Sequence, residues 1–229
     1  MSKLITGIHQ IEITTHCNLR CKYCAHPHMP RSKEDMSEEV FLKALDWVEH
    51  FMACGTQDRE LNFAGIGEST MHPEFSRWVT IARSKLGPSL DFVMATNGVG
   101  VTEEHAQAMS DARMRVWVSL HRPEKAGPTI NMLNKHGVLA GVSADPSIAA
   151  VDWAGQVQWE VTAPKSKTQC QWIAQRYVMV ASDGRILTCC FDGIGTDGVL
   201  GTVFDDLLLM EHKPYSLCKT CHLYRPEAA

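Results

Sequence analysis

Hydrophobic and polar positions between residues 8 and 145 alternate with two periods, one typical of buried strands and the other of amphipathic helices. The clearest helix is predicted over residues 37–53, where apolar side chains recur every three or four positions. Ser37 can cap its start and Gly55 can end it. Two further helices are predicted, over residues 74–86 and from Thr102 onward. Short apolar runs predict strands over residues 8–14, 60–64, 90–95, 115–120 and 138–142.

Strands that alternate with single helices are connected by right-handed crossovers, so they form a parallel sheet. The spacing therefore predicts an α/β fold, either an open doubly wound sheet or a partial (β/α)-type barrel. Both architectures place the ligand site at the carboxyl ends of the strands. Segments rich in cysteine, glycine or polar residues follow the first three predicted strands, at residues 17–24, 65–70 and 96–98, and Ser119 closes the fourth. We expect these segments to meet at one site.

The pattern is less regular after residue 145. A strand is predicted over residues 156–161, and residues 177–181 and 185–188 have the pattern of a β-hairpin. We place a domain boundary near residue 160. It divides the chain into a main domain over residues 1–160 and a small domain, with the hairpin and a group of cysteines, over residues 161–229.

The size and charge of the chain limit what it can be. Its 229 residues are enough for one substantial domain or for a main domain with a small appendage. The formal net charge of −4 gives no reason to expect nucleic acid or a membrane surface as a partner. No apolar run approaches the roughly 20 residues that cross a bilayer, and the first residues lack the apolar core of a signal peptide. We therefore expect a cytoplasmic protein.

Nine cysteines in a cytoplasmic chain require an explanation other than disulfides, because reducing compartments rarely keep disulfides. Three of them fall within residues 17–24 and five within residues 170–221, and such clustering favours metal ligation. The remaining one, Cys54, lies at a predicted helix end and is interpreted as a buried thiol.

Cys17, Cys21 and Cys24 provide three thiolates directly after the first predicted strand. Thiolates are the usual ligands of iron–sulfur clusters, and three of them on a four-iron cluster leave one iron open for another ligand. Zinc sites more often pair their cysteines as CxxC, so the CxxxC step favours a cluster. The alternative is a zinc ion with a fourth ligand from His16, His26 or His28.

This CxxxCxxC spacing after an early strand, with Tyr23 before the last cysteine, resembles the hallmark of the radical S-adenosylmethionine (SAM) superfamily. In that family the open iron of a [4Fe-4S] cluster chelates SAM. One electron from the reduced cluster splits SAM into methionine and a 5′-deoxyadenosyl radical, which removes a hydrogen atom from the substrate. The resemblance therefore implies SAM, a [4Fe-4S] cluster and an electron donor such as flavodoxin or ferredoxin.

Further segments resemble the parts of that family that contact SAM. Residues 65–70 resemble its glycine-glycine-glutamate-proline segment, although serine stands where proline is usual, and glycines there suit a backbone that must approach a ligand. The Thr-Asn-Gly tripeptide at 96–98 also recurs in the family. Each segment has a plainer explanation as a turn or a solvated strand end. The residues that the resemblance assigns to SAM are Tyr23, Gly65, Gly67, Glu68, Ser69, Asn97 and Ser119.

A second group of cysteines follows residue 169, and its order of a cysteine, a hairpin, a cysteine pair and a CxxC unit resembles the Twitch domain, the short form of the SPASM auxiliary-cluster domain. Adjacent strand side chains point to opposite faces, so one of Cys189 and Cys190 is expected to be spare. The resemblance favours Cys189, five residues after Gly184, and implies one auxiliary cluster. Four cysteines permit a four-iron or a two-iron cluster, and we take the four-iron type as the first expectation. A structural zinc ion is the alternative. The expected ligands are Cys170, Cys189, Cys218 and Cys221.

A second cluster suits a net two-electron oxidation, in which a hydrogen atom, a proton and an electron leave the substrate. The arrangement most resembles the 2-deoxy-scyllo-inosamine dehydrogenases, which implies dehydrogenation of a small polyol or amino-sugar-like alcohol. Two alternatives stay open: a maturase that modifies a ribosomally made peptide, and a non-catalytic zinc-binding interaction protein. Asp192 is the candidate catalytic base, Arg176 could bind an anionic group, and His121 lies near the expected site.

Overall fold

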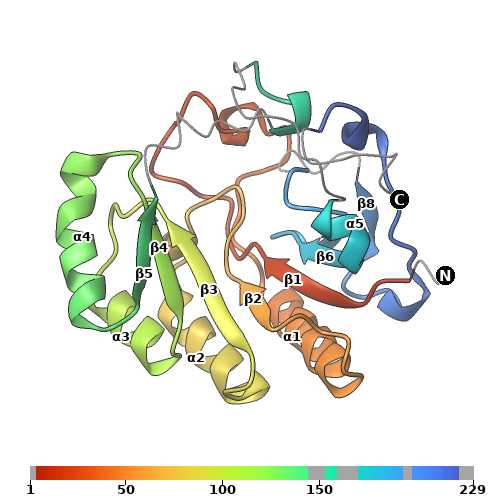
Figure 1. Cartoon of the computed structure of the whole chain (residues 1–229), viewed down its shortest axis with the longest axis horizontal. Helices are drawn as coiled ribbons and strands as arrows, with labels where there is room; N and C mark the ends of the chain where they lie inside the picture. The colour runs from red at the N-terminus through yellow and green to blue at the C-terminus, as the bar shows by residue number, and fades with distance from the viewer. Residues whose placement is uncertain (1–3, 144–152, 159–169, 193–197, 222–229) are drawn as a thin grey trace.

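The structure is a computed structural model that describes residues 4–143, 153–158, 170–192 and 198–221. The strands of this part of the chain form one eight-stranded sheet in the order β5-β4-β3-β2-β1-β6-β7-β8 (Figure 1). Their bounds are β1 Gly7–Ile11, β2 Glu60–Asn62, β3 Asp91–Thr96, β4 Arg115–Ser119, β5 Leu139–Ser143, β6 Tyr177–Val180, β7 Arg185–Leu187 and β8 Val199–Thr202.

Strands β1 to β5 are parallel to their neighbours, and β6 joins the other edge of β1 in parallel. Strands β7 and β8 then continue the sheet in antiparallel fashion. Six adjacent parallel strands with a hairpin at one edge confirm the predicted partial barrel and the predicted C-terminal hairpin. The segment that follows β1 lies above the carboxyl ends of the strands (Figure 1).

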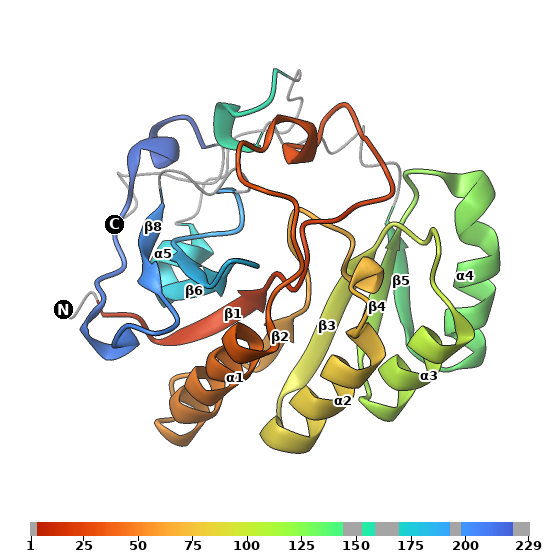
Figure 2. The same ribbon diagram turned by 180° about the vertical axis from the view of Figure 1, so that it is seen from behind.

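Helices α1 to α4 cover one face of the sheet, and α5 lies against β6 on the other (Figures 1 and 2). Ser37 caps α1 by accepting a hydrogen bond from the Val40 N–H at 3.3 Å, and Thr102 forms a capping box with His105 at the start of α3. The three predicted helices are confirmed. The helices are α1 Glu38–Ala53, α2 Phe75–Leu86, α3 Glu103–Asp111, α4 Pro123–Lys135 and α5 Gln171–Gln175.

The core lies between these helices and the sheet. Phe41 of α1 stacks on Trp78 of α2 with ring centroids 4.3 Å apart, and Phe63 meets Phe92 of β3 at 5.1 Å. All four are buried, and each large aromatic ring removes apolar area from water at roughly 25 cal/mol per Å². This packing holds the helices against the sheet. It therefore also fixes the positions of the loops at the strand ends, which carry the candidate site. In the described part of the chain, no helix is both long and apolar enough to cross a membrane.

The structure departs from the sequence prediction at four elements. Helix α4 was not predicted, because Pro128 inside it removes a backbone donor; buried Ala126 and Leu133 hold the helix on the sheet nonetheless. The strand predicted over residues 156–161 is wrong for residues 156–158, which follow a 3₁₀ turn at Trp153–Gly155, and its remainder lies outside the described residues. Strand β8 and the short α5 were also missed. The boundary near residue 160 falls in residues 159–169, outside the described part, and stays a prediction.

Candidate functional site

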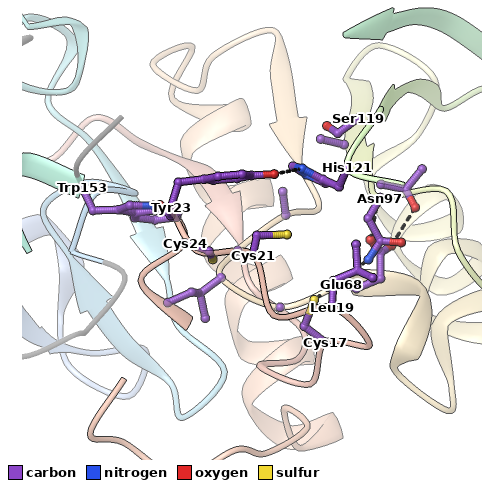
Figure 3. A pocket seen from close by; sticks show the side chains of 16 residues that line it. Cys17, Leu19, Cys21, Tyr23, Cys24, Glu68, Asn97, Ser119, His121 and Trp153 are labelled. Atoms are coloured by element: carbon purple, nitrogen blue, oxygen red, sulfur yellow. Dashed lines mark hydrogen bonds between the residues drawn. The ribbon is translucent and has the colours of Figure 1, made fainter. Parts of the chain in front are cut away.

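A cavity of about 260 Å³ lies at the carboxyl ends of the first four strands (Figure 3). Its walls come from the cysteine loop after β1, the Gly65–Glu68 segment after β2, Asn97 after β3 and Ser119 at the end of β4. The segments predicted to meet at one site therefore do so. Of the residues predicted to contact cluster or SAM, these line the cavity: Cys17, Cys21, Tyr23, Cys24, Gly65, Gly67, Glu68, Asn97 and Ser119.

The three cysteines of the loop line this cavity. Among the described residues, no three His, Cys, Asp or Glu side chains are placed to hold a single metal ion. Burial raises the pKa of the Cys24 thiol to about 11 and also raises that of Cys17. A bound cationic group would reverse this penalty, since metal ligation stabilises the thiolate. The donor set fits a cluster with three thiolate ligands, and its assignment stays a prediction.

Glu68 connects two walls of the cavity. Its buried carboxylate accepts hydrogen bonds from the Thr96 hydroxyl at 2.8 Å and the Thr70 hydroxyl at 2.9 Å. Its second oxygen accepts the Asn97 N–H at 2.7 Å. Burial raises the pKa of Glu68, and these hydrogen bonds oppose that rise. Glu68 therefore holds the loop after β3 against the loop after β2, whether or not it also meets SAM.

Gly65 and Gly67, which follow β2, lie so close to other parts of the chain that a larger residue would not fit at either position. A Cβ at Gly65 would collide with the side chain of Glu12, and one at Gly67 would collide with the carbonyl oxygen of Thr14. Both glycines also line the cavity, so the predicted approach of this backbone to a ligand stays a prediction beside the packing requirement. Ser69 does not line the cavity; its buried hydroxyl donates to the Phe63 carbonyl at 2.9 Å.

Glu12, a residue that sequence reasoning missed, lies fully buried beneath the Gly65 segment. It pairs with Arg31 at 2.6 Å and accepts the Ile66 N–H at 2.7 Å. Arg31 also donates to the Ser182 hydroxyl in the β6–β7 turn at 3.2 Å. This buried pair ties the cysteine loop, the Gly65 segment and the C-terminal hairpin together. A carboxylate between Ile11 and Ile13 in a predicted strand was the signal for it.

Tyr23 is held at two points (Figure 3). Its hydroxyl is hydrogen-bonded to Nδ1 of His121, and its carbonyl accepts the indole N–H of Trp153 at 3.0 Å. Both partners line the cavity. The ring that the family resemblance places against adenine is therefore fixed between the loop after β4 and the 3₁₀ turn at Trp153–Gly155.

The four cysteines predicted for an auxiliary cluster line a second cavity, together with Tyr215, whose hydroxyl lies 3.1 Å from the Cys189 sulfur. Burial raises the pKa of Cys189 to about 12. Cys190 instead packs in the apolar cluster of Met179, Ala181 and Leu187. The donor set fits an iron–sulfur cluster, and the ligand assignment stays a prediction. Sequence reasoning missed Tyr215. The four cysteines are Cys170, Cys189, Cys218 and Cys221.

The two cavities share a thin wall. Trp153 lines the first cavity and the next residue, Ala154, lines the second. The Thr220 hydroxyl, between Cys218 and Cys221 in the sequence, donates to the Ala154 carbonyl. Trp153 also contacts Phe191, a residue of the second cavity, with ring centroids 6.2 Å apart and edge-to-face geometry.

Three other residues singled out in the sequence lie elsewhere. Asp192 is buried, accepts the Gly198 N–H at 2.7 Å and lines neither cavity. His121, by contrast, lines the first cavity as expected. Arg176 ends α5 away from both cavities. The prediction that Cys54 is buried is wrong: it follows the last turn of α1 and is exposed beside His50.

The chain belongs to the radical SAM superfamily, whose family model matches residues 11–163, more than half of its length. It is therefore a radical SAM enzyme, and membership implies a [4Fe-4S] cluster and SAM. The non-catalytic zinc-binding alternative is set aside by this match.

Two curated relatives match parts of the chain. It is 33% identical over 135 residues to the tungsten-containing aldehyde ferredoxin oxidoreductase cofactor-modifying protein of Pyrococcus furiosus, over 59% of this chain and 35% of that protein. It is 36% identical over 93 residues to the GTP 3′,8-cyclase of Chlorobaculum tepidum, over 39% of this chain and 25% of that protein. The chain thus spans about a third and a quarter of the length of these two relatives.

Solved structures share the fold at low identity. BtrN in complex with AdoMet and 2-DOIA superposes with a TM-score of 0.71 at 17% identity, over 91% of this chain and 85% of that one. Streptococcus suis SuiB bound to precursor peptide SuiA gives a TM-score of 0.64 at 12% identity, over 96% and 70%. The likeness to radical SAM structures over nearly the whole chain supports the partial-barrel fold with its C-terminal extension.

Proposed function

We propose that this protein is a radical SAM oxidoreductase that dehydrogenates a small polyol or amino-sugar-like alcohol and passes an electron to an auxiliary iron–sulfur cluster. The observation that carries the proposal is the wall between the two cavities, where Trp153 faces one set of cysteines and Ala154 faces the other. A substrate beside Trp153 would lie between the site of hydrogen removal and an electron acceptor.

In this proposal Cys17, Cys21 and Cys24 hold the first cluster, which supplies the electron that cleaves SAM. The Gly65–Glu68 segment, Asn97 and Ser119 bind SAM, and Tyr23 orients its adenine. Cys170, Cys189, Cys218 and Cys221 hold the second cluster, which supplies an acceptor for one electron. His121 replaces Asp192 as the candidate proton acceptor, because its imidazole lines the cavity. Trp153 and Tyr23 exclude water from the reacting centre.

The proposal predicts two separable activities. Anaerobically reconstituted protein with dithionite should release 5′-deoxyadenosine and methionine from SAM. Cys21→Ala should abolish this cleavage, whereas Cys218→Ala should keep cleavage and lose substrate oxidation. A panel of aminocyclitols and polyols deuterated on the carbinol carbon identifies the substrate by deuterium transfer into 5′-deoxyadenosine. Absence of 5′-deoxyadenosine from protein with a full complement of iron would contradict the proposal.

Two further findings bear on the alternative of a peptide maturase. The SuiB structure was solved with a precursor peptide, and BtrN was solved with 2-DOIA, so neighbours of this fold accept both kinds of molecule. The TM-scores do not separate the two kinds of substrate, because BtrN in an open conformation gives 0.64, the same value as SuiB. Deuterium transfer from a peptide in place of an alcohol would favour the maturase.

A further inference from the structure

A further hollow, of about 240 Å³ and distinct from the two cavities described above, is lined by the cysteine loop and the start of α4. Its charged lining is entirely basic: Arg20 and Lys22 flank Cys21 in the loop, and Arg122 comes from the start of α4. All three side chains are exposed, in a chain whose formal net charge is −4. Arg122 is paired with Glu124 at 2.6 Å, whereas Arg20 and Lys22 have no ion pair among the described residues that would offset their charge. We call this surface the basic hollow.

The basic hollow and the SAM cavity share residues. Leu19, Cys21, Tyr23 and His121 line both of them. Cys21 is partly exposed, and Figure 3 shows its side chain within the group of residues that lines the inner cavity. A candidate cluster ligand therefore separates the basic hollow from the inner cavity, with a side chain that contributes to both surfaces.

We propose that the basic hollow is the docking surface for an acidic one-electron redox protein that reduces the first cluster. The inference rests on the proposed function, since radical SAM chemistry needs one electron for each SAM cleaved. That electron leaves the reduced donor and enters the oxidised cluster, so the donor is oxidised by one electron and no other group changes. Cys21 lines both the basic hollow and the inner cavity, so this candidate cluster ligand would lie between the donor and the cluster.

Charge complementarity selects this partner. A cluster of exposed cations on an acidic protein raises the encounter rate with an acidic partner, and the effect weakens as salt increases. An anionic substrate group is the competing occupant. It is less favoured because Tyr23 and His121, hydrogen-bonded to each other, line both surfaces and form part of the wall between the basic hollow and the inner cavity.

The test compares two reductants on the reconstituted protein. Reduced flavodoxin serves as the acidic protein donor and dithionite as the small one. Lys22→Glu and Arg122→Glu reverse charges on the basic hollow, and Arg122 lies outside the cysteine loop in case Lys22→Glu impairs cluster assembly. Arg59→Glu is the matched control, because Arg59 is exposed and precedes β2 at the amino-terminal end of the sheet. Cluster reduction is followed by loss of visible absorbance in stopped flow.

We expect both hollow variants to slow reduction by flavodoxin roughly tenfold at low ionic strength, with a smaller effect at high salt. In both hollow variants, the rate of reduction by dithionite and the affinity for SAM should stay at wild-type values. The control variant Arg59→Glu should be reduced by flavodoxin at the wild-type rate. Unchanged flavodoxin rates in both variants would overturn the inference. Weaker SAM binding or slower dithionite-driven cleavage would assign the basic hollow to a small anion and also overturn it. Cluster reduction without any 5′-deoxyadenosine from wild-type protein would count against the proposed function alone.

Discussion

The hydroxyl of Tyr23 is hydrogen-bonded to Nδ1 of His121, and both side chains line the cavity that the cysteine loop encloses. The contact joins residues 98 positions apart in the sequence. It ties the aromatic residue of the cluster loop to the end of β4, so the orientation of the ring depends on the sheet.

This contact predicts coupled effects on SAM affinity. Tyr23→Phe and His121→Phe should each weaken SAM binding to the reconstituted protein roughly two- to tenfold, since each removes a hydrogen bond worth about 1 kcal/mol. The double variant should bind no more weakly than the weaker single variant. Dissociation constants come from anaerobic equilibrium dialysis. His105→Phe, in α3, is the control, and purely additive effects of the two changes would show that the contact has no role in binding.

The collision at Gly67 predicts a steep cost for one added methyl group. Gly67→Ala should lower the free energy of unfolding by about 1–3 kcal/mol, as overpacking does, because its Cβ would meet the Thr14 carbonyl. Gly127→Ala, in α4 with open space around it, should instead stabilise the protein by roughly 0.5–1 kcal/mol. Chemical denaturation measures both. Equal effects of the two substitutions would show that the backbone approach at Gly67 is not tight.

His72 predicts a loss of stability in acid. Its Nδ1 accepts the Glu74 N–H at 3.1 Å, and burial lowers its pKa below the ordinary 6.5. Between the folded pKa and 6.5 the unfolded chain binds more protons, so this contribution is fully present above pH 6.5 and declines as the pH falls. The free energy of unfolding should therefore depend on pH less steeply in His72→Asn, whose side-chain oxygen can accept the same N–H. Matching slopes between pH 7.5 and 5.5 would contradict the assignment.

The separation of Cys189 from Cys190 predicts different metal contents. Cys189→Ala should lose the auxiliary cluster, about four irons, whereas Cys190→Ala should keep it. The reason is that Cys189 lines the second cavity and Cys190 packs against Met179, Ala181 and Leu187. Iron and sulfide analysis after reconstitution measures this, and loss of iron in the Cys190 variant with retention in the Cys189 variant would reverse the assignment.

The sequence was informative where local chemistry decides structure. Ser37 and Thr102 cap helices as predicted, and the loops after the first four strands meet because parallel strands end at the same edge. It was less informative where distant segments compensate for local signals. Pro128 argues against a helix that tertiary packing preserves, and the Glu12–Arg31 pair forms between separate segments that only the fold brings together.

The same limit applies to the two cysteine groups. Spacing alone predicts each set of ligands, but the adjacency of Trp153 and Ala154 to different cavities depends on the turn at Trp153–Gly155, which the sequence analysis did not predict. Two consecutive non-glycine residues with positive φ, 51° and 59°, form that turn, a conformation that local propensity disfavours.

The measurement that tests the account most directly is iron, sulfide and zinc per chain after anaerobic reconstitution. The account predicts about eight irons, from two four-iron clusters held by thiolates. About four irons and one zinc would keep radical chemistry at the first cavity and remove the electron acceptor from the second, which would contradict the proposed dehydrogenation. Zinc without iron would contradict both cluster assignments.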